Sequence, residues 1–176
     1  MITPEVVDTR RLRVVTAIVQ DHPGVLSRVS GMVRRRGFNI QGLTVGPTGV
    51  PGRSRMTLTV DAGHAEADQV EKQLDRLIEV IEIRDVTDSP KLLRELAIVK
   101  VSVTGEQREQ TTREVQGFGG RLLAANEALV IYELSGEFES VESFLGLMRP
   151  LGIVDIARSG PVAMTSLAGL AGPEGE

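Results

Sequence analysis

Residues 12–45 read LRVVTAIVQDHPGVLSRVSGMVRRRGFNIQGLTV, and this stretch decides the fold. Its first eight residues are mostly apolar and β-branched, and so short a run favours a strand over a helix. Asp21-His22-Pro23-Gly24 breaks the run, and from Val25 onward apolar residues recur at offsets of one, four, seven and eight. That spacing predicts an amphipathic helix with Gly37 as its natural stop, and residues 38–45 predict a second strand.

The residues that follow add a helix and two more strands. Residues 46–52 contain too much glycine and proline to continue a strand, so they predict a loop, whereas 55–61 alternate strictly and predict a strand with one buried face. A second helix is predicted from the apolar spacing of Val70, Leu74, Leu77 and Ile78, and a fourth strand from Ile81 and Ile83. The order over residues 12–87 is therefore βαββαβ. This is the ferredoxin-like arrangement of four antiparallel strands with two helices on one face and the other face uncovered.

The same order of elements starts again after a boundary at residues 85–91. Predicted strands are 96–103, 121–125, 129–134 and 153–157, and predicted helices are 106–116 and 138–148. The helix at 106–116 is the least typical, because Val115 is almost its only large apolar residue. We therefore predict an α+β protein with two tandem ferredoxin-like βαββαβ domains, at residues 12–87 and 94–160. Residues 88–93 would link them, residues 1–11 would form an N-terminal arm, and the Gly-, Ala- and Pro-rich residues 161–176 a mobile tail.

The composition restricts the classes of function. A net charge of -4 and a pI near 5.3 disfavour non-specific binding to nucleic acid, which requires basic surface. We interpret the basic cluster Arg34-Arg35-Arg36 as favourable charge at a helix end rather than as a phosphate contact. The absence of cysteine excludes disulfides and thiolate metal sites, and the two histidines, His22 and His64, form no cluster for a metal. With no apolar stretch of membrane-spanning length and no secretion signal, we expect a cytoplasmic protein, or an organellar one after processing.

The sequence contains no convincing catalytic motif. A phosphate-binding P-loop, a dinucleotide fingerprint and a Ser/His/Asp arrangement are all missing, and His22 would have to serve any histidine-dependent mechanism alone. The glycine-rich loop at 46–52 joins two strands and lacks the helix dipole that phosphate loops use, so a plain hairpin loop is the preferred interpretation. We expect a binding protein without a cofactor of its own rather than an enzyme.

The turn between the first strand and the first helix is the best candidate for a site. Pro23 suits the first position of a helix, and the backbone N–H groups of the three residues after it would point at a carboxylate. Asp21 could receive an ammonium group and nearby branched side chains an aliphatic one, so the turn suits a branched α-amino acid. The alternative is structural, with Asp21 as a helix cap and no ligand. Asn39 is open to the same two interpretations, because its amide could bond its own backbone or a ligand.

At these positions the sequence resembles a known family, the ACT domain of the regulatory subunit of acetolactate synthase (acetohydroxyacid synthase). The resemblance rests on the segments DHPGVLSRV at 21–29, RGFNI at 36–40, LTV at 43–45 and SRMT at 54–57. The segments KQL at 72–74, REL at 94–96 and ARSG at 157–160 are similar to the C-terminal half of that family, so the likeness covers residues 10–162. Many ACT domains share the turn, whereas the spacing from Gly37 to Met56, joined to a matching second domain, is much more specific. The family often has asparagine where this chain has Asp21.

The resemblance implies a homodimer whose ACT domains pair side by side into a continuous sheet, with a branched-chain amino acid, typically valine, bound between the protomers. The matching effector-binding residues would be Asp21, His22, Pro23, Gly24, Val25 and Leu26 of the turn, with Asn39 and Ile40 from the other protomer. The implied partner is the catalytic large subunit, which this chain would activate and subject to feedback inhibition in branched-chain amino acid biosynthesis. Thiamine diphosphate, magnesium and FAD would then belong to the large subunit.

Two rival interpretations stay open. A free-standing amino-acid-sensing ACT protein could regulate another enzyme or a transcription factor, although the sequence shows no helix-turn-helix and no basic face. A small ferredoxin-like enzyme would need a pocket with convergent titratable groups, which the sequence does not display. Recovery of a larger thiamine-dependent synthase with this chain in a pull-down would exclude both.

Overall fold

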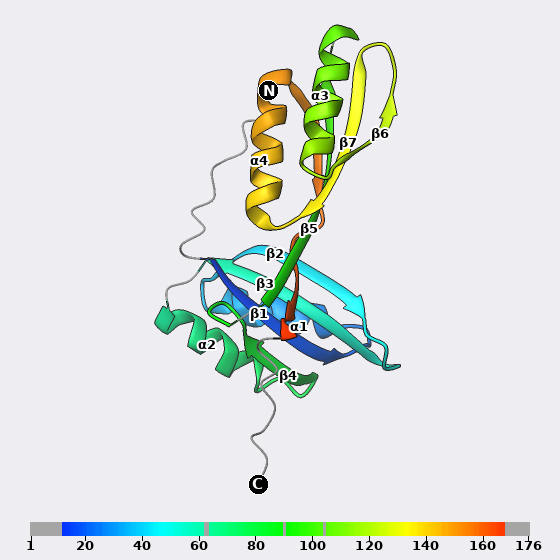
Figure 1. Cartoon of the computed structure of the whole chain (residues 1–176). Helices are drawn as coiled ribbons and strands as arrows, with labels where there is room; N and C mark the ends of the chain where they lie inside the picture. Colours follow the sequence, from blue (N-terminus) through cyan, green and yellow to red (C-terminus); the bar gives the residue numbers. More distant parts are fainter. Residues whose placement is uncertain (1–11, 62–63, 90, 104, 168–176) are drawn as a thin grey trace. The chain divides into compact units, whose positions relative to one another are not determined.

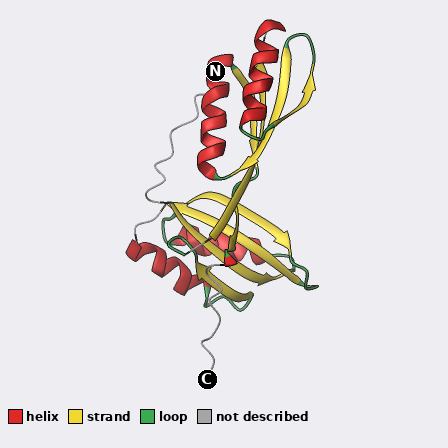
Figure 2. Ribbon diagram, viewed as in Figure 1, coloured by secondary structure: helices red, strands yellow, loops and turns green. Residues whose placement is uncertain are grey.

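Two compact units make up the part of the chain that the computed structural model describes, which is residues 12–61, 64–89, 91–103 and 105–167 (Figure 1). The C-terminal unit is Leu93–Gly160. The N-terminal unit consists of the described residues from 12 to 92 together with 161–167, so the chain enters it twice. Each unit combines helices with a sheet (Figure 2). Among the described residues, no helix is long and apolar enough to cross a membrane.

The N-terminal unit has the predicted βαββαβ order. Its elements are β1 (Leu12–Gln20), α1 (Val25–Arg35), β2 (Asn39–Pro47), β3 (Arg53–Asp61), α2 (His64–Leu74) and β4 (Val80–Asp85). Each strand is antiparallel to its neighbours in the order β2-β3-β1-β4, which leaves β2 and β4 at the edges. This is the ferredoxin-like topology that the sequence predicts. α1 ends before Gly37, whose φ of 76° is the left-handed conformation expected of a glycine stop.

The core of this unit is aliphatic and lies between the helices and the sheet. Val25, Val29 and Val33 repeat every four residues along α1, and all three are buried. They pack in one cluster with apolar residues of β3 and of α2. These are Met56, Leu58 and Val60 of β3, and Val70 and Leu74 of α2. The strict alternation in β3 therefore gives the predicted strand with one buried face, because its apolar side chains face the helices.

The end of α2 differs from the prediction. The apolar spacing predicts a helix through Ile78, but α2 ends at Leu74. The N–H of Leu77 then donates to the Leu74 carbonyl over 3.0 Å, a tight turn that keeps Leu77 against the core and directs Ile78 outward. Ile78 is consequently 82% exposed, so its predicted place in the core is wrong.

β4 contains a β-bulge that the sequence pattern does not reveal. Glu82 and Val80 pair with consecutive residues of β1, so Ile81 between them is the extra residue of the bulge. Ile81 is therefore exposed, and Val80 packs against the core together with Ile83. The predicted alternation, with Ile81 and Ile83 on one face, is wrong for this reason.

The sheet face opposite the helices is partly covered, contrary to the prediction. A short strand, β9 (Val162–Thr165, red in Figure 1), lies against β1 after the chain returns from the C-terminal unit. Ala163 of β9 is fully buried, and its N–H donates to Thr57 Oγ1 over 3.2 Å. The first part of the predicted mobile tail is thus a packed strand. Residues 168–176 lie outside the described residues, as does the predicted arm at 1–11.

The C-terminal unit repeats the topology of the N-terminal one. The elements of this half are β5 (Lys91–Ser102), α3 (Gly105–Gly117), β6 (Arg121–Ala125), β7 (Leu129–Gly136), α4 (Phe138–Met148), a short 3-10 helix (Arg149–Leu151) and β8 (Ile153–Arg158). Its strand order, β6-β7-β5-β8, corresponds position by position to β2-β3-β1-β4. Residues 91–93, predicted to lie in a linker, belong to β5.

α3 confirms the least typical of the predicted helices. Although most of its side chains are polar, Val115 is fully buried in the core of the C-terminal unit and Thr111 is also buried. The hydroxyl of Thr112 lies 2.9 Å from that of Tyr132, a fully buried residue of β7. The helix therefore satisfies the one polar atom of a large core side chain, which helps to hold it on the sheet.

Two glycines of this unit allow a matched test of packing. An added Cβ at Gly120 would lie 2.8 Å from the Glu133 carbonyl oxygen and 2.8 Å from Val115 Cγ1, whereas Gly146, inside α4, has open space around it. Gly120→Ala should lower the free energy of unfolding by about 1–3 kcal/mol, the usual cost of overpacking. Gly146→Ala should raise it by up to about 1 kcal/mol, because alanine is the better helix former. Urea unfolding followed by circular dichroism measures both, and equal midpoints for the two variants would contradict this packing.

Candidate functional site

The predicted turn between β1 and α1 has a fixed backbone. The N–H of Asp21 donates to the Gly52 carbonyl over 2.9 Å, which ties the turn to the loop between β2 and β3. Gly24 has φ 96° and ψ -17°, and α1 begins at the next residue, Val25. Pro23 therefore does not occupy the first helical position, as the sequence predicts, but lies two residues before it. The left-handed residue between them interrupts the helical backbone, and glycine adopts that conformation without strain.

The start of α1 presents backbone N–H groups that have no partner. The N–H of Arg28 donates to the Gly24 carbonyl over 3.0 Å. Within the described part of the chain, nothing accepts a hydrogen bond from the N–H groups of Leu26 and Ser27. These donors stand at the positive end of the helix dipole, so the turn can receive a carboxylate. The N–H of Val25, predicted to be free, donates to the His22 carbonyl over 3.5 Å. Sequence reasoning missed Ser27 because it placed the helix start too early.

The side chains of Asp21 and His22 are exposed beside this helix start. No side chain caps α1, so the alternative role of Asp21 as a helix cap is wrong. Among the described residues the Asp21 carboxylate has no hydrogen-bond or ion-pair partner, which leaves it available to an ammonium group. The His22 ring lies 3.2 Å from Gln20 Oε1 through Nε2 and 3.1 Å from the Pro23 carbonyl through Nδ1. His22 therefore contacts both sides of the turn and braces it.

The two flanks of α1 face different edges of the sheet. Arg28 Nη1 donates to Glu79 Oε1, whose carboxylate is 4% exposed and directly precedes β4. Leu26 lies two residues earlier, about 200° away around the helix, so it faces the β2 side. Leu26 is 46% exposed. Val45 of β2, which pairs with the core residue Met56, is 43% exposed. The turn thus has apolar surface on the β2 side, part of which, Val45, sequence reasoning did not assign to the site.

Asn39 and Ile40 do not reach this turn within one chain. Asn39 begins β2 and pairs with Asp61, the last residue of β3, whereas Gln20, just before the turn, pairs with Arg53, the first. β3 has nine residues, so eight steps, roughly 26 Å, separate the two ends. Asn39 is exposed, and Ile40 is half-buried against the core. The predicted site residues therefore fall into two groups at opposite ends of one sheet.

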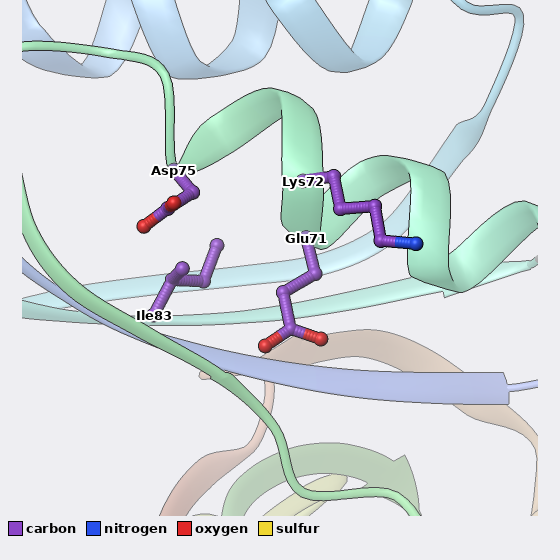
Figure 3. Close-up of a pocket in the computed structure, with 4 residues that line it drawn as sticks. All are labelled: Glu71, Lys72, Asp75 and Ile83. Carbon is purple, nitrogen blue, oxygen red and sulfur yellow. The ribbon is translucent and has the colours of Figure 1, made fainter.

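A separate hollow of about 320 Å³ is lined by residues of α2, of the turn that follows it and of β4, at the edge of the sheet away from β2 (Figure 3). Its lining residues are Glu71, Lys72, Asp75 and Ile83. Figure 3 shows Lys72 extending away from Asp75. The described residues hold no group of three or more side chains that could ligate a metal. Two of the four lining residues are acidic and one is basic, so the net negative charge of the hollow disfavours an amino acid's carboxylate, and the turn is the better candidate.

Both halves of the chain match families of known proteins. Residues 15–82 match the AHAS small subunit-like ACT domain, and residues 94–167 match the family described as small subunit of acetolactate synthase. The probable acetolactate synthase small subunit of Methanothermobacter thermautotrophicus is 39% identical over 153 residues, which is 86% of this chain and 91% of that protein. The acetolactate synthase small subunit of Mycobacterium bovis is 38% identical over 150 residues, 85% of this chain and 89% of that protein.

A solved structure is similar over most of the chain. The crystal structure of the acetolactate synthase small subunit from Thermotoga maritima is 32% identical with a TM-score of 0.80, and the match covers 89% of this chain and 98% of that one. The second family match continues to residue 167, beyond the end of the C-terminal unit at Gly160. The matched region therefore includes β9.

Proposed function

Because the chain belongs to the acetolactate synthase small-subunit family, we propose that it senses a branched-chain amino acid and passes the signal to the catalytic large subunit. The effector is valine, bound between two copies of the N-terminal unit. In branched-chain amino acid biosynthesis the small subunit activates the large subunit and confers feedback inhibition on it. The chain is itself non-catalytic, and thiamine diphosphate, magnesium and FAD belong to the large subunit.

The observation that carries this proposal is the position of β2 at an edge of its sheet (Figure 1). Two copies that pair their β2 strands antiparallel about a two-fold axis would form one continuous sheet. Such pairing sets the start of one β2, with Asn39, beside the end of the other at Pro47. Pro47 pairs with Ser54 and Ser54 with Val19, so this end of β2 is also the end at which the turn lies. A dimer would thereby join the two groups of site residues that one chain keeps apart.

The joined site matches the three parts of a branched α-amino acid. The effector's carboxylate accepts from the N–H groups of Leu26 and Ser27, and hydrogen bonds to a charged group contribute about 1.5–3 kcal/mol each. Its ammonium group lies between the Asp21 carboxylate and the amide oxygen of Asn39 from the other protomer. Its aliphatic side chain covers Leu26 and Val45, which are otherwise exposed.

A site shared by two protomers explains how the effector could alter the enzyme. An effector shifts a conformational equilibrium only by its differential affinity for the two states, typically about 1–3 kcal/mol of coupling. Contacts to the turn of one protomer and to Asn39 of the other exist together in only one arrangement of the dimer. Valine therefore stabilises that arrangement, and the large subunit responds to it.

Gly24→Asp should abolish valine inhibition of the reconstituted enzyme while leaving its activation intact. The introduced carboxylate takes the place of the effector's own and repels it from the helix start. An added Cβ at Gly24 meets no atom within 4 Å, so the new side chain has room. Acetolactate formation with rising valine concentration, with and without the small subunit, measures both properties.

The matched control is Gly24→Asn. Both residues tolerate the left-handed backbone of Gly24 better than other side chains do, and they have the same shape, so they share the backbone strain and differ in charge. We expect the Asn variant to keep valine inhibition at a higher valine concentration. If valine inhibited the Asp variant as strongly as the wild type, the proposed position of the effector at this turn would be wrong.

A further inference from the structure

The return segment, residues 161–167, is attached to two strands of the N-terminal unit. Thr44 Oγ1 of β2 donates to the Pro161 carbonyl over 2.9 Å. The N–H of Ala163 donates to Thr57 Oγ1 of β3, and both of these residues are buried. A buried alanine, these two hydrogen bonds and the pairing of β9 with β5 fix the segment across the face of the sheet that the helices leave open.

β2 has no spare room beneath this segment. A Cβ added at Gly42 would lie 2.6 Å from Thr59 Oγ1 and 3.1 Å from Pro161 Cδ, so the proline ring rests almost directly on the β2 backbone. Gly42 is three residues from Asn39, which the proposed function assigns to the effector site. Packed groups in this close contact transmit a displacement rather than absorb it. A shift of β2 must therefore move Pro161.

The other end of the segment is joined to a fixed part of the C-terminal unit. Pro161 follows Gly160, the last residue of that unit. Arg158, two residues earlier at the end of β8, donates to both oxygens of Glu95 over 2.7 and 2.8 Å. The N–H of Ser159 donates to the Leu96 carbonyl over 3.0 Å. Only Gly160 separates this anchored chain from the residue that rests on β2.

We propose that the return segment carries the effector signal from β2 to the C-terminal unit. This inference rests on the proposed function, because it takes the start of β2 as part of the effector site. Valine that binds Asn39 across the dimer fixes the position of β2. The packing of Pro161 against the β2 backbone at Gly42 then has a different free energy with and without the effector. The segment must stay packed on the N-terminal sheet for valine to inhibit the enzyme, but not for valine to bind.

Ala163→Glu tests this by placing a carboxylate at a buried position, which should displace the segment. Its matched control is Met164→Glu, which adds the same charge one residue later at a side chain that is 56% exposed. Three measurements apply to each full-length variant: valine affinity by calorimetry, activation and valine inhibition of the reconstituted enzyme, and hydrogen exchange at residues 161–167. We expect Ala163→Glu to raise exchange and to leave the reconstituted enzyme uninhibited at saturating valine. Valine should still bind, with an affinity lowered by no more than the coupling between the two sites, about 5- to 150-fold. Met164→Glu should behave as the wild type.

Thr57→Val is a milder second variant, because it removes the acceptor of the Ala163 N–H with little change of shape. It should weaken inhibition in the same direction, by a smaller factor. If the Ala163→Glu variant showed raised exchange but normal valine inhibition, the inference would be overturned. Loss of valine binding in this variant would also overturn it, since the segment would then belong to the binding site itself. If Ala163→Glu does not fold, normal inhibition by Thr57→Val overturns it. A wild-type protein that binds no valine would instead refute the proposed function.

Discussion

Two homodimers that cannot bind valine should give one working site when their chains are mixed. Gly24→Asp damages the turn and Asn39→Ala damages the start of β2, so each homodimer is expected to lose both of its sites. In the mixed dimer, the intact turn of the Asn39→Ala chain meets the intact Asn39 of the Gly24→Asp chain. We therefore expect one valine per mixed dimer, against two per wild-type dimer.

The expected losses are large enough to count sites. Removing an amide that bonds a charged ammonium group costs about 1.5–3 kcal/mol, which weakens binding roughly 10- to 150-fold. The carboxylate at position 24 adds repulsion to the loss. Chains with two different affinity tags, purified in sequence, give the pure mixed dimer, and titration calorimetry then measures the number of bound valines.

The matched control carries the same two substitutions on one chain. A dimer of a wild-type chain with a Gly24→Asp/Asn39→Ala chain has one damaged group in each site, so it should bind no valine at all. If this dimer bound one valine and the first mixed dimer none, the turn and Asn39 would act within a single chain. The separation of the two groups along β3 makes that result incompatible with the structure.

The sequence predicts the elements of both units well because their patterns are local. The alternation in β3 and the four-residue repeat of α1 each report one buried face, and both are observed. Even α3, with Val115 as its main apolar residue, was predictable, because the order of elements around it repeats the first half. A repeated topology supplied what the helix's own composition lacked.

The errors arise where a residue's environment is set by a distant part of the chain. Ile81 is exposed because β4 carries a bulge against β1, and pairing register is not visible in a six-residue strand. Ala163 lies in a segment whose composition is that of a loose tail, yet it is fully buried, and its N–H donates to Thr57, 106 residues earlier. Composition describes a segment alone and does not register what it packs against.

The candidate site shows the same division. The turn was predictable because the order Asp, Pro, Gly before an amphipathic helix is a local signal, although Gly24 moves the helix start. Val45 needed the strand order, which places β2 at an edge beside the exposed flank of α1. The Arg28–Glu79 ion pair identifies the flank of α1 that faces β4, and so the opposite flank that faces β2. It joins residues 51 positions apart and has no sequence signature.

Arg158→Met should be strongly destabilising. Arg158 donates to both oxygens of Glu95, whose carboxylate is 5% exposed, and to Glu142 Oε1 over 2.7 Å. Removing the guanidinium leaves a buried, uncompensated carboxylate, for which a loss of roughly 3 kcal/mol in the free energy of unfolding is expected. Methionine keeps most of the apolar stem, so the loss reports charge rather than packing. Urea unfolding measures it.

A double substitution and an exposed pair provide the controls. Glu95→Gln combined with Arg158→Met removes both charges, so it should recover a large part of the loss. Arg94→Met breaks the pair with Glu137, whose side chains are 51% and 62% exposed, and should cost less than about 1 kcal/mol. Equal losses for Arg158→Met and Arg94→Met would show that burial of Glu95 has no energetic consequence.

The pH dependence separates this ion pair from an ordinary surface one. The hydrogen bond to Glu95 raises the pKa of Arg158 above its ordinary value, although burial opposes the rise. A group whose pKa is raised by folding contributes its stability fully below its unfolded pKa, and loses it only as the pH rises toward the higher folded value. The difference in unfolding free energy between wild type and Arg158→Met should therefore be the same at pH 7 and at pH 10. A difference that shrank over this range would mean that Arg158 loses its proton well below its ordinary pKa, which the contacts with Glu95 and Glu142 oppose.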